Sequence, residues 1–166
     1  RDVSGTTGDG GGGGTGQCTS DANCAVDYYC SAGNCIKLIC ASGYYISNHT
    51  CVPSTHKLQI TSYEPVIYAR LNGTNSTKVT VKNNGTVTGL STMLNTTVGD
   101  GISVSVSPSS PYSLDSGESY VFNVTFVISN NSAIGNHSGT FKAYVSTNSS
   151  IYDAKSFALV VLPNTE

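Results

Sequence analysis

The chain has 166 residues, 11% of them charged, and a net charge of −2. That length suits one ordinary domain with a small appendage. The low charge argues against nucleic-acid binding and gives no attraction to anionic lipid, and the longest plain apolar run, residues 157–162, is far shorter than the ~20 residues of a membrane span.

Residues 1–17 form a glycine-rich tail that contains the run Gly-Asp-Gly-Gly-Gly-Gly-Gly-Thr-Gly. Such a segment cannot build a core and is typical of a flexible linker. Its lack of side chains would also let it lie close against another backbone, in a groove or along a sheet edge. We therefore expect it to contact neighbouring copies of the chain; a free linker or a contact with its own domain is the alternative. Because the chain begins at Arg1 rather than Met, we expect a processed chain or part of a longer one.

Residues 18–52 are dense in cysteine, which is typical of small modules that are held by disulfides in an oxidising compartment. The six cysteines are Cys18, Cys24, Cys30, Cys35, Cys40 and Cys51. A segment this short has too little apolar surface to fold alone, and each bridge contributes about 2–4 kcal/mol by restricting the unfolded chain. The spacing leaves the pairing open. Zinc sites usually contain Cys-x2-Cys pairs, which this segment lacks, so we expect no metal.

The last cysteine loop, Cys40-Ala-Ser-Gly-Tyr-Tyr to Cys51, resembles the final loop of epidermal-growth-factor-like modules. The resemblance covers about twelve residues. It implies a bridge between Cys40 and Cys51, with Cys18–Cys30 and Cys24–Cys35 interleaved. The calcium-binding motif of that family is absent.

Residues 53–56 are expected to form a hinge, and residues 57–166 alternate apolar and polar side chains in short runs. Alternation is typical of strands with one buried face, and no helical period occurs. The expected strands cover residues 58–60, 66–71, 77–82, 88–95, 102–106, 120–128, 141–145 and 157–162. Residues 83–85, Asn-Asn-Gly, predict a turn, because these residue types tolerate positive φ. Short strands with turn-rich joints predict an all-β, antiparallel β-sandwich.

Residues 120–128 give the clearest pattern. The even positions, Tyr120 to Ile128, are all large and apolar, whereas the odd positions include Asn123 and Thr125. We expect this central strand to have one face in the core and one face outside.

Three segments, residues 79–85, 114–122 and 139–145, resemble the immunoglobulin-like domains of prokaryotic, archaeal-type surface proteins of the CARDB and NEW3 kinds. The resemblance covers roughly residues 57–163. It implies an immunoglobulin-like β-sandwich and a cell-surface context and carries no chemistry. The Cys–Trp–Cys core of antibody domains is missing, because there is no tryptophan and no cysteine after Cys51.

Nine of the 14 asparagines stand two residues before Ser or Thr. This tripeptide, the sequon, is the acceptor pattern for N-linked glycans. The nine asparagines are Asn48, Asn72, Asn75, Asn84, Asn95, Asn123, Asn130, Asn136 and Asn148. With 43 Ser and Thr in the chain, chance would give about four. We expect Asn123 on the outer face of its strand, Asn95 near a strand end, and six in the joints: Asn72, Asn75, Asn84, Asn130, Asn136 and Asn148. The excess predicts an extracellular glycoprotein from a eukaryotic or archaeal lineage; a merely polar surface is the alternative.

No active site is evident. His49 and His137 each occupy the middle of a sequon, where an acceptor needs exposure, and the acidic residues form no metal-binding motif. We therefore expect a non-enzymatic protein without a cofactor. Two tyrosine pairs, residues 28–29 and 44–45, are interpreted as the core of the cysteine module, with an exposed contact surface as the alternative.

The leading functional hypothesis is a structural subunit of a glycosylated extracellular assembly, in which the tail and the sheet edges engage copies of the same chain. The alternative is the ectodomain of an adhesin or stalk that binds a ligand or a partner cell. A third hypothesis, a carbohydrate-binding appendage of a secreted enzyme, would require a catalytic domain beyond residues 1–166.

Overall fold

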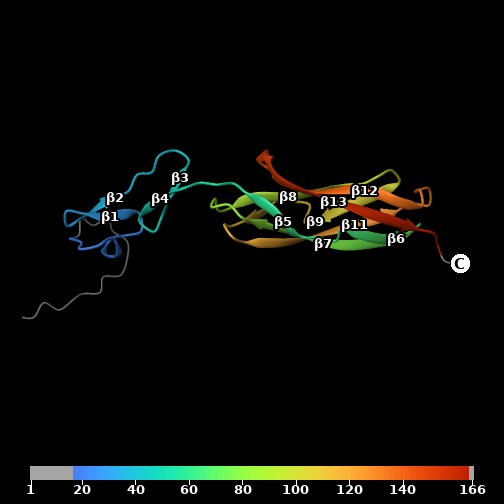
Figure 1. Ribbon diagram of the computed structural model, residues 1–166, viewed down its shortest axis with the longest axis horizontal. Coiled ribbons are helices and arrows are strands. Elements are labelled where there is room, and N and C mark those ends of the chain that lie inside the picture. Colours follow the sequence, from blue (N-terminus) through green and yellow to red (C-terminus); the bar gives the residue numbers. More distant parts are fainter. Residues whose placement is uncertain (1–16, 165–166) are drawn as a thin grey trace, which may run out of the picture. The chain divides into compact units, whose positions relative to one another are not determined.

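The structure is a computed structural model that describes residues 17–164. These residues form thirteen strands and one short 3-10 helix and contain no α-helix, which confirms the predicted all-β class (Figure 1). The chain divides between Ser54 and Thr55 into two compact units, a disulfide-rich module and a β-sandwich. The expected contact between the glycine-rich tail and other copies falls, apart from Gln17, outside the described residues.

The disulfide-rich module contains the 3-10 helix η1 (Asp21–Asn23) and two antiparallel hairpins. In the first hairpin β1 (Tyr28–Ser31) pairs with β2 (Asn34–Lys37), and in the second β3 (Tyr44–Ser47) pairs with β4 (Thr50–Pro53).

Both hairpins close through two-residue turns with positive φ at each central residue. Ala32 and Gly33 have φ of 48° and 80°, and Asn48 and His49 have φ of 45° and 60°. This is the geometry of type I′ turns, whose twist matches that of the flanking strands. The second turn therefore places a sequon asparagine, Asn48, at the tip of a hairpin.

Three disulfides hold the module together and leave no free cysteine among the described residues. The bridges are Cys18–Cys30, Cys24–Cys35 and Cys40–Cys51, the same pairs that the growth-factor-like resemblance implies. Cys18 is the only buried apolar residue between residues 17 and 54. The bridges therefore take the place of a hydrophobic core in this unit.

The second unit is a sandwich of two sheets, as predicted (Figure 1). The four-stranded sheet has the order β5 (Leu58–Ser62), β7 (Thr74–Asn83), β11 (Ser119–Ile128) and β9 (Ile102–Ser107). The five-stranded sheet has the order β10 (Tyr112–Leu114), β8 (Leu90–Thr97), β12 (Gly135–Val145), β13 (Asn148–Leu162) and β6 (Val66–Arg70).

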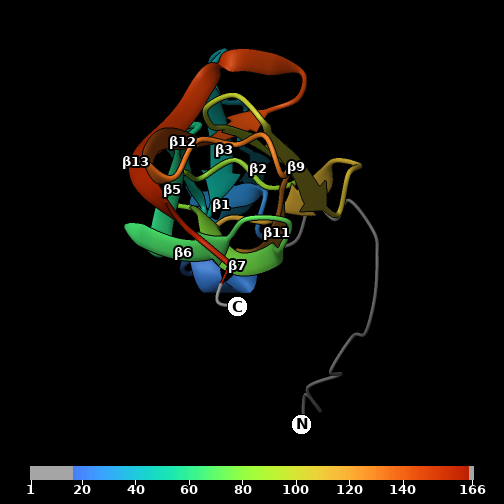
Figure 2. The ribbon, with the colours of Figure 1, turned by 90° about the vertical axis from the view of Figure 1, so that its right-hand side faces the viewer.

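One pairing departs from the predicted antiparallel arrangement, because β6 runs parallel to β13. The chain leaves the four-stranded sheet after β5, passes Pro65 and joins the other sheet as β6 at the free edge of β13. Proline has no N–H for a sheet ladder, so it suits this crossing between sheets. The three strands lie along the same side of the sandwich (Figure 2).

The predicted central strand lies within β11, and its alternation is confirmed. Phe122, Val124, Phe126 and Ile128 are buried, whereas the odd positions between them are exposed or half-buried. Across the core, the ring of Phe157 from the other sheet lies 5.6 Å from that of Phe126. Burial of each such side chain contributes about 1.5–3 kcal/mol.

The turn predicted at residues 83–85 is present, but for a different reason from the one expected. None of these residues has positive φ. Instead, Asn83 is fully buried and its amide donates to the carbonyls of Val87 and Leu114, at 2.8 and 3.1 Å. A Cβ on Gly85 would lie 2.2 Å from the carbonyl oxygen of Thr55, so only glycine fits there. A buried amide and a close backbone approach thus shape the turn.

Candidate functional site: the sequon asparagines

Four sequon asparagines lie outside the strands and are exposed. Asn48 is in the β3–β4 turn, and Asn72, Asn84 and Asn130 are in joints of the sandwich, as predicted. Asn72 has a φ of 52°, which asparagine adopts more easily than most residues. These four positions leave the acceptor accessible without disturbing a ladder.

Three further asparagines were expected in joints, and the structure places them in strands. Asn75 is the second residue of β7, Asn136 the second of β12 and Asn148 the first of β13. These strand ends are rich in Ser, Thr and Asn and lack apolar alternation, but their backbones still pair with the neighbouring strand. The hydrophobic pattern therefore underestimates the length of the strands.

The two asparagines expected on or near outer faces are where they were predicted. Asn95 lies near the end of β8, opposite Lys142 of β12, and Asn123 lies in the middle of β11, opposite Lys78 of β7. Both asparagines are exposed. Each sheet therefore carries a sequon on its outer face.

Asn75 differs from the other sequon asparagines because its side chain is held by the fold. Its Nδ2, the atom that would carry a glycan, donates to the backbone carbonyl of Tyr68 in the other sheet. Its Oδ1 accepts from the N–H of Ser76 at 2.7 Å. The hydroxyl-bearing residue of the same sequon, Thr77, is buried. Asn75 thus joins the two sheets and is poorly placed as a glycan acceptor.

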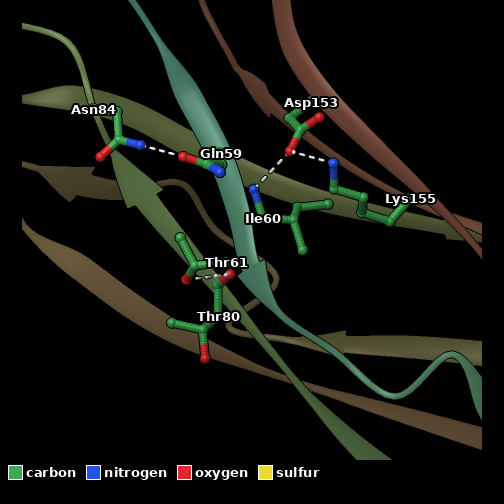
Figure 3. Close-up of polar contacts among 7 residues, drawn as sticks. All are labelled: Gln59, Ile60, Thr61, Thr80, Asn84, Asp153 and Lys155. Atoms are coloured by element: carbon green, nitrogen blue, oxygen red, sulfur yellow. Dashed lines mark hydrogen bonds and ion pairs between the residues drawn. The ribbon is translucent and has the colours of Figure 1, made fainter.

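Asn84 also uses its Nδ2, but its partner is the exposed side chain of Gln59 in β5 (Figure 3). A long surface side chain can move aside at little cost. Asn84 therefore remains available, unlike Asn75, whose partner is a backbone carbonyl.

The other seven sequon asparagines have Nδ2 atoms that make no hydrogen bond within residues 17–164. They are Asn48, Asn72, Asn95, Asn123, Asn130, Asn136 and Asn148. At Asn148 only the oxygen is engaged, since Oδ1 accepts from the N–H and the hydroxyl of Ser150, at 3.2 and 2.6 Å. Adding Asn84, eight of the nine sequons present an accessible acceptor amide.

No sequon lies in one of the four edge strands, but of the exposed acceptors in strands only Asn123 has a paired neighbour on both sides, since Asn95, Asn136 and Asn148 lie beyond the ends of β10, β8 and β6. The four edge strands, β5, β9, β6 and β10, contain no asparagine, whereas β8, β11, β12 and β13 each carry an exposed acceptor. Sugars on these acceptors would stand on the inner strands of each sheet or on the turns. The backbone groups along the four edge strands would stay accessible to another chain.

A polar contact that the sequence analysis missed joins the two sheets at β5. Oδ2 of Asp153 in β13 accepts from the backbone N–H of Ile60 at 2.8 Å, and Nζ of Lys155 lies 3.5 Å from the same oxygen (Figure 3). The N–H of Ile60 lies where the pairing of β5 with β7 shifts register. Asp153 and Lys155 lie on the same face of β13 as the buried Phe157 and Leu159. Two charged residues at alternate positions in line with core residues are the sequence signal that could have revealed the contact.

The histidines of the two sequons hold backbone carbonyls. Nδ1 of His49 contacts the carbonyl of Tyr28, which links the two hairpins of the module. Nε2 of His137 lies 2.7 Å from the carbonyl oxygen of Ala133. Both rings are half-buried. Both contacts can be made with a ring N–H as donor, and they give the rings a structural role.

Three cysteine sulfurs, those of Cys18, Cys24 and Cys35, lie within 4.8 Å of one another, and they are the only grouping of three potential metal ligands among residues 17–164. All three belong to disulfides. A disulfide sulfur has no thiolate to offer a metal, so this cluster is a pair of adjacent cross-links.

The tyrosines interpreted as the core of the module are mostly on its surface. Tyr29, Tyr44 and Tyr45 are 36, 49 and 37% exposed, and only Tyr28 is half-buried. The core interpretation is therefore wrong for three of them, because the disulfides already fix the short hairpins. Ile39, at 85% exposure, adds a further apolar side chain to this surface.

No helix within residues 17–164 has the length and hydropathy needed to cross a membrane. The three disulfides indicate an oxidising, extracellular environment.

No family model and no curated protein matches the chain. Among solved structures, the chain is similar to a family 123 glycoside hydrolase from Clostridium perfringens, with 10% identity and a TM-score of 0.47 over 60% of this chain and 23% of that one. It is also similar to the CARDB domain of a Pyrococcus furiosus protein, with 17% identity and a TM-score of 0.39 over 66% of this chain and 89% of that one.

A third similar structure is the major pilin subunit of Bacillus cereus, with 8% identity and a TM-score of 0.40 over 83% of this chain and 60% of that one. The present chain spans only 23% of the length of the hydrolase. At these identities and TM-scores the matches assign no family, activity or partner to the chain.

Proposed function

We propose that this chain is a structural subunit of an extracellular, heavily N-glycosylated surface assembly, such as a filament, a pilus-like fibre or a lattice. The observation that carries the proposal is the arrangement of the sequons. Eight acceptor amides are accessible, and none of them lies on an edge strand. In the proposed subunit, glycans supply the solubility that a surface with few charges lacks.

The free sheet edges and the glycine-rich tail are the proposed contacts between copies. An edge strand presents unpaired N–H and C=O groups that another extended segment can use. A glycine-rich segment can approach such an edge closely, because it has no side chains in the way. Contact of one copy's tail with the next copy's sandwich would be head-to-tail and would give an open polymer.

We further propose that the sandwich is of the CARDB or NEW3 kind in an archaeal-type surface protein, and that the module is a growth-factor-like unit. The support is the strand and turn segments at residues 79–85, 114–122 and 139–145, together with the loop between Cys40 and Cys51. The proposed role is non-enzymatic and requires no cofactor.

The test is electron microscopy and sedimentation of the native glycoprotein beside a variant that lacks residues 1–16. This deletion keeps Cys18 and the bridge between Gln17 and Asn34. We expect polymers from the full chain and single subunits from the variant. Polymers of normal length from the variant would refute the role of the tail, and a monodisperse full chain would refute the assembly itself.

A second candidate function, an adhesin or stalk ectodomain, is favoured by the exposed tyrosines of the module. Exposed aromatic side chains are common at binding surfaces. The discriminating experiment compares binding to partner cells and to a glycan array for the wild-type chain and a Tyr44→Ser, Tyr45→Ser variant. Loss of binding in the variant would support this candidate, whereas the absence of any ligand for the wild type would count against it.

A further inference from the structure

An apolar row lies on the outer face of the five-stranded sheet, at the pairing of β6 with β13. Tyr68 is 59% exposed and Val66 is 45% exposed. In the parallel register Tyr68 is opposite Val160, and Val66 is opposite Ala158. Directly paired residues project from the same face of a sheet, so the four side chains form one continuous apolar strip. Exposed apolar surface of this kind commonly marks a contact site.

A sequon asparagine stands at the end of this strip. Val160 is opposite Tyr68 on one side and opposite Asn136 of β12 on the other. The three residues therefore form a straight row across three strands, about 10 Å from first to last. Asn136 is exposed, and its side-chain amide makes no hydrogen bond within residues 17–164. A group attached to its Nδ2 begins beside Val160 and has Tyr68 directly ahead of it.

The chemistry of the row suits a sugar. A pyranose ring has a face of C–H groups and an edge of hydroxyls, so it can cover an apolar side chain while its hydroxyls remain in water. A tyrosine ring offers a flat apolar face together with a polar hydroxyl, which is the matching surface. A first sugar on Asn136 would span about the width of one strand, enough to cover Val160, and a second would reach the ring of Tyr68. Covering this strip removes apolar area from water, which is favourable.

We infer that the N-linked glycan of Asn136 lies along the sheet across Val160 and packs on Tyr68, so that the sugar forms an outer layer of the sandwich at its β6 edge. The inference rests on the glycosylation in the proposed function and adds to it a specific seat for one glycan. It also assigns a role to Tyr68, which the described residues leave 59% exposed.

The glycan of Asn95 is the matched control on the same face. The row from Asn95 passes through Lys142 and Ala154 and meets no residue of β6, since β6 pairs only with residues 158–162. A sugar on Asn95 therefore has no aromatic ring in its row to pack on.

The experiment has two parts, both on the full glycosylated chain after mass spectrometry has confirmed occupancy. In the first, proton NMR measures ring-current shifts of the Asn136-linked sugar in the wild type and in a Tyr68→Ser variant. We expect upfield-shifted sugar protons that return to ordinary values in the variant. The sugar on Asn95 has Tyr144 and Tyr152 in the adjoining row of the same face, so any shift it shows should be the same in the two proteins.

In the second part, a double-mutant cycle combines Tyr68→Ser with Asn136→Gln and measures the thermal midpoint of the sandwich. We expect the loss caused by Tyr68→Ser to shrink by at least half in the Asn136→Gln background, and to be unchanged in an Asn95→Gln background. Additive effects, together with ordinary sugar shifts at an occupied Asn136, would overturn the inference and leave the proposed function intact.

Two other outcomes also decide the matter. An unmodified Asn136 in a chain that carries sugars elsewhere would overturn the inference alone, whereas a chain without sugars at any sequon would overturn the proposed function as well. If Tyr68→Ser instead abolishes a dimer, the strip is covered by a second copy of the chain and the inference is wrong.

Discussion

At the scale of single residues, Asn75 shows that the asparagine of a sequon can stabilise the fold instead of carrying a glycan. Its strand partner is Phe126, so its side chain lies on the inner face of β7, near the end of the core. There it donates to a carbonyl of the opposite sheet instead of reaching solvent. The tripeptide at residues 72–74 differs in this respect, since Asn72 stands in an exposed turn.

We predict that Asn75→Asp destabilises the sandwich by about 1–3 kcal/mol, because a carboxylate cannot donate to the carbonyl of Tyr68. Asn72→Asp is the matched control. It also removes a sequon, but it breaks no hydrogen bond and should change stability by less than ~0.5 kcal/mol. Urea unfolding of chains produced without glycans measures both. Equal effects of the two substitutions would contradict the structural role of Asn75.

The hydrogen bond from Asn75 to the carbonyl of Tyr68 also predicts whether the sequon at residues 75–77 carries a glycan. We expect peptide mass spectrometry of the native protein to find sugar on Asn72 and none on Asn75, because the acceptor nitrogen of Asn75 is engaged and Thr77 is buried. A glycan on Asn75 in most molecules would show that the contact with Tyr68 is not made in the native protein.

At the scale of elements, Asp153 connects β13 of one sheet to β5 of the other. We predict that Asp153→Ala destabilises the sandwich by roughly 1–2 kcal/mol, because the N–H of Ile60 loses a charged acceptor. Asp153→Asn keeps an acceptor oxygen and should cost less. Lys155→Ala removes only a partly exposed ion pair and should cost less than about 1 kcal/mol.

Hydrogen exchange at the amide of Ile60 gives the local readout for these three variants. Exchange should accelerate in Asp153→Ala and stay close to the wild-type rate in Lys155→Ala. If Lys155→Ala accelerates exchange as much as Asp153→Ala, the ion pair rather than the hydrogen bond holds β5 in place.

How far the sequence predicts these elements depends on where apolar side chains alternate. Residues 120–128 alternate throughout, so β11 could be placed with its faces assigned. The first residues of β12 and β13 are polar or glycine, so the pattern treated Asn136 and Asn148 as parts of joints. The buried amide of Asn83 had no sequence signal beyond a turn motif, because its partners, Val87 and Leu114, are brought to it only by the fold.

At the scale of the whole molecule, the two units are stabilised by different means. The module has three cross-links and a single buried apolar residue, whereas the sandwich has a large apolar core and no cysteine. We predict that a reducing agent unfolds the module and leaves the sandwich folded. Hydrogen exchange should show loss of protection between residues 18 and 54 alone.

The control is thermal unfolding of the sandwich in oxidised and reduced protein, followed by its tyrosine signals in near-ultraviolet circular dichroism. The cooperative transition of the core should keep its midpoint. A sandwich that loses this transition on reduction would mean that its stability depends on the module.

The parallel seam between β6 and β13 also decides how the sandwich bears mechanical load. A pull between the two ends of this unit acts first on β5, which is paired with β7. Once β5 yields, the pull draws β6 towards its start and β13 towards its finish, which are opposite directions along a shared axis. The bonds between residues 66–70 and 158–162 are then sheared together instead of being opened one at a time. A subunit exposed to flowing liquid or to a tethered neighbour would thereby resist extension at the seam between β6 and its last strand, β13.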